Sequence, residues 1–294
     1  MTLVAIDMDG TLLTSDGTIS EENIKAIQEV QQLGHQITIC SGRSHPDIQQ
    51  ILQKYGIEAS IISGNGAMVY HGDFVIQLFL SDKMITDLLA ILKNNNVFVE
   101  IYTEQGIIME ENSSLFLYEE IERLAKSNLI DEKASKQRAN IILNQNSIIR
   151  VPDIHALDFS KMRIYKMNGV TFDPNKRSLL MDLINRRDDI SVTTGGPATI
   201  EFGHGKTNKG YGLQCLAEHL QIPLEETLAI GDNFNDIPMF KVAGQSIAMA
   251  NSEKEVKQLA TYMTDDHNRH GVAKALRKYV IEKGILDVER ESKS

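Results

Sequence analysis

Near both ends of this sequence, short apolar runs alternate with amphipathic helical segments. The middle of the sequence has a different pattern. The run at residues 3–6 has no polar interruption, which is typical of a strand buried on both faces of a parallel sheet. Runs at 36–40 and 59–63 follow, and helical patterns at 20–33 and 44–55 separate the three runs. Strand–helix–strand units of this length connect parallel strands by right-handed crossovers. The start of the chain is therefore predicted to form a parallel sheet covered by helices.

The same rhythm returns after residue 203, with helices predicted at 209–220, 237–242, 253–259 and 270–282 and strands at 227–230 and 246–249. Between the two parts, helices are mixed with hairpin-like strands, which is typical of an α+β layer. These elements are helices at 83–93, 113–126 and 175–187, and strands at 98–103, 107–110, 162–167, 190–193 and 199–202. We therefore predict an α/β protein with a Rossmann-like, doubly wound parallel-sheet core. The core comprises residues 1–80 and 204–294, and an α+β cap domain, residues 81–203, is inserted into it.

Composition excludes several classes of function. The chain has 40 acidic and 30 basic residues and a net charge of −10, so its surface repels the phosphates of nucleic acids and anionic lipids. No apolar run approaches the ~20 residues that a membrane-spanning helix needs. The only cysteines, Cys40 and Cys215, fit a reducing compartment. We expect a cytoplasmic protein that acts on a small molecule and binds neither nucleic acid nor membrane. The sequence does not indicate an oligomeric state.

Polar residues follow three of the predicted core strands at the point where each strand ends. The first strand leads into Asp7 and Asp9, the second into Ser41, and the strand after the inserted segment into Asp232. Ligands bind at the carboxyl ends of the strands in an open parallel sheet, so these side chains are expected at one edge. Any single aspartate here could simply cap a helix or start a turn. Aspartates at two strand ends, with a hydroxyl at a third, instead indicate a site.

Carboxylates gathered in this way repel one another, by ~4 kcal/mol for two of them ~4 Å apart at an effective dielectric constant of 20. A divalent cation removes that repulsion. Mg²⁺ favours carboxylate and water oxygens together with substrate phosphate. The sequence therefore predicts a Mg²⁺ site, and Mg²⁺ beside a nucleophilic carboxylate indicates phosphoryl transfer.

These motifs resemble those of the haloacid dehalogenase superfamily, and most closely those of its Cof-type hydrolases. In the family's order they are Asp7-Met8-Asp9-Gly10-Thr11-Leu12-Leu13, Ser41, Lys209-Gly210 and Gly231-Asp232-Asn233-Phe234-Asn235-Asp236. The segments Asn65-Gly66-Ala67 and His270-Gly271-Val272-Ala273 are also similar to that branch. The resemblance covers nearly the whole chain, is strong in the core and vague in the cap, and says little about the substrate.

The resemblance implies a role for each motif residue. Asp7 would attack phosphorus and form an aspartyl-phosphate, while Asp9 would protonate the leaving oxygen and then activate water. The Asp7 carboxylate, the Asp9 backbone carbonyl and Asp232 would hold Mg²⁺. The phosphoryl oxygens would be held by the amides of Met8 and Gly42, the Ser41 hydroxyl, Asn235 and Lys209. Asp236 would orient Lys209 or the residues around the metal.

Two assignments have an alternative within the sequence. Lys206 lies close to Lys209, but Lys209 directly precedes Gly210 at the start of a predicted helix, as the family's lysine does. Arg43 could reach a phosphate or pair with a carboxylate. The function that follows is a Mg²⁺-dependent phosphatase acting on small phosphorylated metabolites such as sugar phosphates. The alternatives are a phosphomutase that uses the same aspartyl-phosphate and a non-catalytic sensor of phosphorylated metabolites.

Overall fold

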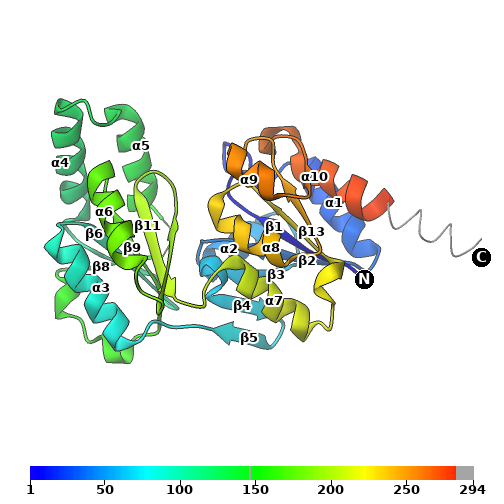
Figure 1. Cartoon of the computed structure of the whole chain (residues 1–294), viewed down its shortest axis with the longest axis horizontal. Coiled ribbons are helices and arrows are strands. Elements are labelled where there is room, and N and C mark those ends of the chain that lie inside the picture. Colours follow the sequence, from blue (N-terminus) through cyan, green and yellow to red (C-terminus); the bar gives the residue numbers. More distant parts are fainter. Residues whose placement is uncertain (146, 283–294) are drawn as a thin grey trace, which may run out of the picture. The chain divides into compact units, whose positions relative to one another are not determined.

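The computed structural model describes residues 1–145 and 147–282 and shows a mixed α/β protein (Figure 1). The chain divides into two compact units. The core unit comprises Met1–Ile76 and the described residues from Asn208 on, and the inserted unit comprises Gln77–Thr207. The chain leaves the core unit after residue 76, where 80 was predicted, and returns after 207, where 203 was predicted. Residues 283–294 of the predicted core lie outside the described residues.

The core unit is built on an eight-stranded sheet with the order β14-β13-β12-β1-β2-β3-β4-β5. Its strands are β1 (Leu3–Asp7), β2 (Gln36–Cys40), β3 (Ser60–Ser63), β4 (Met68–His71), β5 (Phe74–Gln77), β12 (Thr227–Gly231), β13 (Gln245–Ala248) and β14 (Tyr262–Met263). Neighbouring strands from β14 to β3 are parallel, and β4 runs antiparallel to β3. The strand order reverses between β1 and β12, which is where open parallel sheets bind their ligands.

Helices cover both faces of this sheet, because alternate residues of each buried strand point to opposite faces. Val4 and Ile6 of β1 pack in one cluster with α1 (Glu21–Gln32), α2 (His45–Lys54) and α10 (Gly271–Leu276). Leu3 and Ala5 pack in another with α7 (Lys209–His219), α8 (Ile237–Val242) and α9 (Lys254–Leu259). A π-helical turn, Arg277–Ile281, continues α10, so the predicted last helix is not a uniform α-helix. The core is therefore doubly wound, as predicted.

The inserted unit is a six-stranded sheet with the order β10-β11-β9-β6-β7-β8, antiparallel except between β7 and β8. Its strands are β6 (Phe98–Thr103), β7 (Ile107–Glu110), β8 (Ile148–Val151), β9 (Ile164–Val170), β10 (Ile190–Thr194) and β11 (Thr199–His204). Its helices are α3 (Asp82–Asn94), α4 (Ser113–Lys126), α5 (Glu132–Leu143) and α6 (Pro174–Ile184). Side chains of α3 and α6 share one apolar cluster with the sheet.

The sequence did not predict α5 or β8. Helix α5 buries only Ala139, Ile142 and Leu143, its other residues are mostly polar, and Ile141 is exposed, so its apolar periodicity is weak. Strand β8 has no fully buried residue, and therefore lacks the alternation that marks a half-buried strand. Within residues 1–145 and 147–282, no helix has both the length and the apolar character needed to cross a membrane.

Candidate active site

Strands β1 and β12 bring two aspartates to the same edge of the core sheet. The strands pair in parallel with Ile6 opposite Ile230, so Asp7 and Asp232 leave adjacent strand ends. The chain then turns at Gly10, whose φ is +79°, and a Cβ there would lie 2.5 Å from Oδ2 of Asp232. Only glycine fits a left-handed position this close to another side chain. The Thr11 hydroxyl donates to Oδ1 of Asp232 at 3.0 Å, which fixes that carboxylate against the turn.

Lys209 occupies the space beside Asp7 because of where α7 begins. The Asn208 side chain caps the helix by accepting a hydrogen bond from the Tyr211 amide at 2.9 Å. A Cβ at Gly66 would lie 2.1 Å from the Asn208 carbonyl oxygen, so glycine at 66 allows the helix to start this close to the turn after β3. The lysine is completely buried. Its Nζ donates to Oδ1 of Asp7 at 2.5 Å and to Oδ1 of Asp236 at 2.6 Å.

Asp236 positions this lysine and the loop after β12 at the same time. Its Oδ1 accepts from Lys209, and its Oδ2 accepts from the backbone amides of Asp232 at 2.8 Å and Asn233 at 2.9 Å. Both oxygens are therefore engaged by protein donors. Among the described residues, carboxylate oxygens of Asp7, Asp232 and Asp236 lie within 4.8 Å of one another. Of these three groups, Asp7 and Asp232 are the better placed to bind a further cation.

The site carries more negative than positive charge. Burial first, and then the Asp236 carboxylate, raises the pKa of Asp7, while Lys209 opposes the shift. Burial and Asp236 likewise raise the pKa of Asp232 to about 6. Burial opposes the charged form of Lys209, but the carboxylates of Asp236 and Asp7 outweigh it and raise the lysine's pKa. Three carboxylates thus face one ammonium group, and a hard divalent cation with oxygen ligands fits this excess charge and donor set.

Asp9 is held by Arg43 rather than within the buried cluster. Its side chain is 57% exposed, and Arg43 donates to it from Nε at 2.8 Å and from Nη2 at 2.7 Å. The guanidinium also donates to Asp47 at 2.8 Å. The hydrogen bond to Asp9 is the largest cause of the raised pKa of Arg43. Of the two interpretations of Arg43, the structure shows the pairing with carboxylates.

The residues predicted to hold phosphate follow β1, β2 and β12. Asp7 is opposite Cys40 in the sheet, so Met8 and Ser41 come next on neighbouring strands, and both are buried. The Ser41 hydroxyl accepts from the Arg43 amide at 3.2 Å. Gly42 is half-buried. Nδ2 of Asn235 donates to Asn65 at 3.2 Å, and among the described residues Oδ1 of Asn235 is buried without a hydrogen-bond partner.

Lys206 and Cys40, which are close to site residues in sequence, have different surroundings. Lys206 is exposed and belongs to the inserted unit, whereas Lys209 lies between Asp7 and Asp236. The Cys40 thiol is fully buried, and burial raises its pKa, which is typical of a packed, unreactive thiol.

The structure also shows contacts at this edge for polar groups to which the sequence assigned no role. Thr11 and Asn251 both reach Asp232, at 3.0 Å and 3.5 Å. Asn65 has a φ of +57° in the turn after β3 and lies against Asn235. The sequence feature that could have identified Asn251 is its position three residues after β13, a strand parallel to β12.

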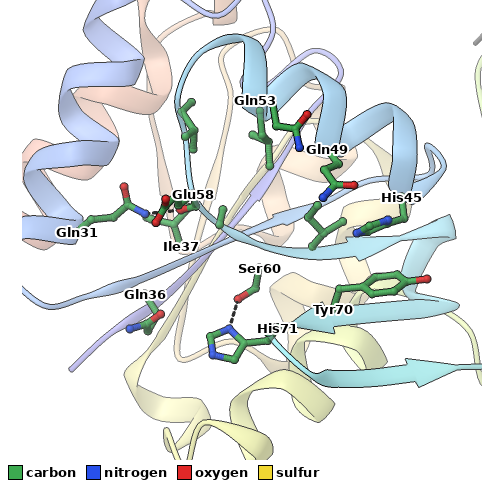
Figure 2. Close-up of a pocket in the computed structure, with 15 residues that line it drawn as sticks. Gln31, Gln36, Ile37, His45, Gln49, Gln53, Glu58, Ser60, Tyr70 and His71 are labelled. Carbon is green, nitrogen blue, oxygen red and sulfur yellow. Dashed lines mark hydrogen bonds between the residues drawn. The ribbon is translucent and has the colours of Figure 1, made fainter.

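A groove on the core unit has different chemistry. It has a volume of about 650 Å³ and lies beside α2, β3 and β4 (Figure 2). The His45 and Tyr70 rings are in contact, with centroids 3.8 Å apart and planes tilted by 34°, and His71 is hydrogen-bonded to Ser60 at 2.7 Å. Most of its other polar lining is glutamine, and none of the predicted site residues lines it. The groove therefore lacks the carboxylate cluster from which the phosphoryl chemistry was inferred.

The chain matches the family of haloacid dehalogenase-like hydrolases over residues 4–276. Phosphatase YwpJ of Bacillus subtilis (strain 168) is 31% identical over 282 residues, which cover 94% of this chain and 99% of that protein. The 5-amino-6-(5-phospho-D-ribitylamino)uracil phosphatase YwtE of the same organism is 30% identical over 276 residues, covering 93% and 96%. A solved structure of a haloacid dehalogenase-like hydrolase from B. subtilis aligns with a TM-score of 0.83 at 29% identity, covering 95% of this chain and 100% of that one.

Proposed function

The chain belongs to the haloacid dehalogenase-like hydrolase family and is a phosphatase, and we propose that it hydrolyses small phosphorylated metabolites with Mg²⁺ through an aspartyl-phosphate. One observation carries the proposal. A fully buried lysine fixes Asp7 next to Asp232 and Asp236, and the three carboxylates outnumber the available positive charge. Phosphoryl transfer depends mainly on positioning and on cationic stabilisation of phosphoryl oxygens. A buried nucleophile in a site that attracts a divalent cation supports both the positioning and the cationic stabilisation.

The metal ligands of this proposal are Asp7, Asp232 and the backbone carbonyl of Asp9. A bound Mg²⁺ supplies charge neutralisation and fixes the orientation of the phosphoryl oxygens. Asp236 holds Lys209 and the loop of Asp232 in place, because both of its oxygens are already engaged.

Asp7 acts as the nucleophile. One of its oxygens attacks phosphorus, and the bond between phosphorus and the ester oxygen breaks. Asp9 gives a proton to that oxygen, so the organic product leaves as an alcohol. Asp9 then takes a proton from water as the water oxygen attacks phosphorus, which releases phosphate and restores the Asp7 carboxylate. Lys209 keeps Asp7 oriented through Oδ1 and offsets negative charge on the transferring group.

Hydrogen-bond donors from the ends of β1, β2 and β12 and from the start of α7 complete the proposed phosphate site. These are the Met8 and Gly42 amides, the Ser41 hydroxyl, the Lys209 ammonium and the Asn235 side chain. Asn65 holds Asn235 at 3.2 Å, which supports a fixed orientation of that amide.

We assign recognition of the organic part of the substrate to a different region of the chain. The core groups named above interact with the phosphoryl group, so they cannot distinguish one organic group from another. We propose that the inserted unit acts as a cap that makes this choice. The relative YwtE is named for a phosphorylated ribitylaminouracil, which makes phosphorylated sugars and sugar alcohols the first compounds to examine.

A cytoplasmic location is supported by the two free cysteines.

A phosphate-release assay tests the proposal. The full chain is incubated with a panel of phosphomonoesters, in Mg²⁺ and in chelator, beside the Asp7→Asn variant. We expect release with Mg²⁺ only, and none from the variant. Transfer of the phosphoryl group within a sugar without free phosphate would instead identify a phosphomutase. Binding of a phosphorylated compound without any turnover would identify a sensor.

A further inference from the structure

We propose that Asn251 is a positioning residue for the metal site, because its side-chain amide ties Asp232 to the turn that follows Asp7. The inference rests on the proposed function, since it needs the divalent cation at Asp7 and Asp232. Asn251 follows β13 and lies 241 residues from Gly10 in sequence. Its Nδ2 nevertheless donates to the Gly10 carbonyl at 2.8 Å and reaches Oδ2 of Asp232 at 3.5 Å.

The orientation of the Asn251 amide is fixed from its other side. The backbone amide of His267 donates to Oδ1 of Asn251 at 3.3 Å. Because an N–H group can only donate, the amide oxygen must face His267, and the NH₂ group must face the two acceptors. The Ala250 amide also donates to the Asp265 carbonyl at 3.3 Å, so the loop that carries Asn251 is joined to the loop that carries His267.

Asp232 is thereby held by neutral donors on both of its oxygens. Thr11 donates to Oδ1 at 3.0 Å, and Asn251 approaches Oδ2. A neutral donor fixes a carboxylate without cancelling its charge, and each carboxylate oxygen can accept more than one interaction. Asp9 differs from Asp232, because both of its carboxylate oxygens accept hydrogen bonds from the Arg43 cation. Asp232 therefore keeps its charge for a metal ion.

The contact with Gly10 extends this effect to the other metal ligands. Gly10 follows Asp9, whose carbonyl belongs to the proposed ligand set, and its backbone packs directly against Asp232. One amide group thus fixes the distance between the β1 turn and the β12 loop, which carry separate parts of the ligand set. Residues that orient metal ligands in this way typically contribute 10- to 100-fold to metal affinity, an order of magnitude taken from other metal sites.

Direct metal binding tests this assignment without turnover. Mn²⁺ is titrated into the purified full chain and free Mn²⁺ is measured by electron paramagnetic resonance, with Mg²⁺ added as competitor. For Asn251→Ala we expect the Kd for both ions to rise about 10- to 100-fold. Asn268→Ala is the matched control. The Asn268 side chain bonds Ser15 and the His267 ring, not Asp232 or the His267 amide that orients Asn251. The Kd of Asn268→Ala should therefore stay within about twofold of wild type.

Two further measurements separate positioning from a general effect on the fold. Asn251 is exposed, so Asn251→Ala and Asn268→Ala should unfold at similar temperatures in chelator. Thr11→Val, which keeps the shape but removes the other donor to Asp232, should also raise the Kd. If Asn251→Ala binds Mn²⁺ and Mg²⁺ as tightly as wild type, the inference is wrong and the proposed function stands. If wild type binds neither ion, the metal site of the proposed function is wrong, and the inference is wrong with it.

Discussion

The core unit and the inserted unit each bury a lysine against carboxylates, but at different places in their sheets. In the core unit, Lys209 starts a helix and contacts Asp7 and Asp236 at strand ends. In the inserted unit, Lys166 lies within β9, donates to Glu201 of β11 at 3.1 Å and sits 4.1 Å from the centre of the Tyr102 ring. Strand ends can turn toward a ligand, whereas mid-strand side chains face their neighbours in the sheet.

The surroundings of the two lysines differ as well. Glu100, the second carboxylate near Lys166, accepts hydrogen bonds from the amides of Gln145 at 2.6 Å and Asn168 at 2.7 Å. Burial raises its pKa, and these amides and Lys166 lower it in part. Protein donors thus compensate part of the buried charge in the inserted unit. In the core unit a larger negative excess is left, and we interpret that excess as the place for a cation.

The largest expected effect comes from removing the proposed nucleophile. Asp7→Asn should abolish phosphatase activity, because the amide is a far weaker nucleophile and the uncatalysed hydrolysis of phosphate monoesters is slower by up to ~10²¹-fold. Glu201→Gln is the comparison in the inserted unit. It should leave Mg²⁺-dependent hydrolysis of a generic aryl phosphate measurable. The assay is phosphate release by both purified variants. Substantial activity in Asp7→Asn would falsify the assignment of the nucleophile.

The second prediction concerns the two lysines. Lys209→Met and Lys166→Met each leave buried carboxylates without their cation, so each should lower the free energy of unfolding by about 3–5 kcal/mol. Chemical denaturation with and without Mg²⁺ distinguishes the two variants. Mg²⁺ should restore part of the stability of Lys209→Met, because Asp7 and Asp232 are its proposed ligands, and should not help Lys166→Met. Equal responses of the two variants to Mg²⁺ would show that the carboxylates around Lys209 and those around Lys166 do not differ in metal binding.

The third prediction is a pH dependence. The folded-state pKa of Asp232 is about 6, above the ordinary value of about 3.9. Between these values the folded protein holds a proton that the unfolded chain has released. Without metal, the contribution of Asp232 to the free energy of unfolding therefore falls as pH rises from about 4 to about 6. Mg²⁺ competes with that proton, so its affinity should rise over the same range.

Competition between Mn²⁺ and Mg²⁺ from about pH 4.5 to 7 measures this dependence directly. In the inserted unit, Glu100 also has a raised pKa, but we expect no effect of Mg²⁺ on its titration. An affinity for Mg²⁺ that is flat across this range would contradict the link between Asp232 and the ion.

The smallest effect on stability is expected for two arginines with similar partners. Arg43 pairs with Asp9 and Asp47, and Arg187 pairs with Asp87 and Asp189. Partly exposed ion pairs of this kind contribute about 0–1 kcal/mol, so Arg43→Ala and Arg187→Ala should change urea unfolding little. Steady-state kinetics should differ, because only Arg43 holds the proposed acid–base group. Unchanged kcat and KM in Arg43→Ala would show that its pairing with Asp9 has no role in the reaction.

Much of the core and its acidic site could be predicted because the relevant signals are local. An apolar run that ends in aspartate marks a strand end, and parallel strands place their ends at one edge. The Asn251 contacts with Gly10 and Asp232 were harder to predict, because Asn251 lies three residues beyond its strand end and the order of the strands in the sheet is not a local signal. An asparagine in a loop resembles any other loop asparagine until the fold brings β13 beside β12. Helix α5 was missed for a different reason, since its polar sequence carries few of the buried positions on which a helix prediction depends.

The order of segments along the chain has a consequence for synthesis on the ribosome. Strand β1 lies in the centre of the core sheet between β2 and β12, yet β12 begins only at Thr227. While the inserted unit emerges and folds through its own contacts, one edge of β1 has no partner strand, and unpaired edges invite aggregation. Lys209 also emerges after the whole inserted unit, so Asp7 cannot form its ion pair until most of the chain has been made. A nascent chain of this protein therefore has its proposed nucleophile early and its complete acidic cluster late, and in between the open edge of β1 can pair with other chains.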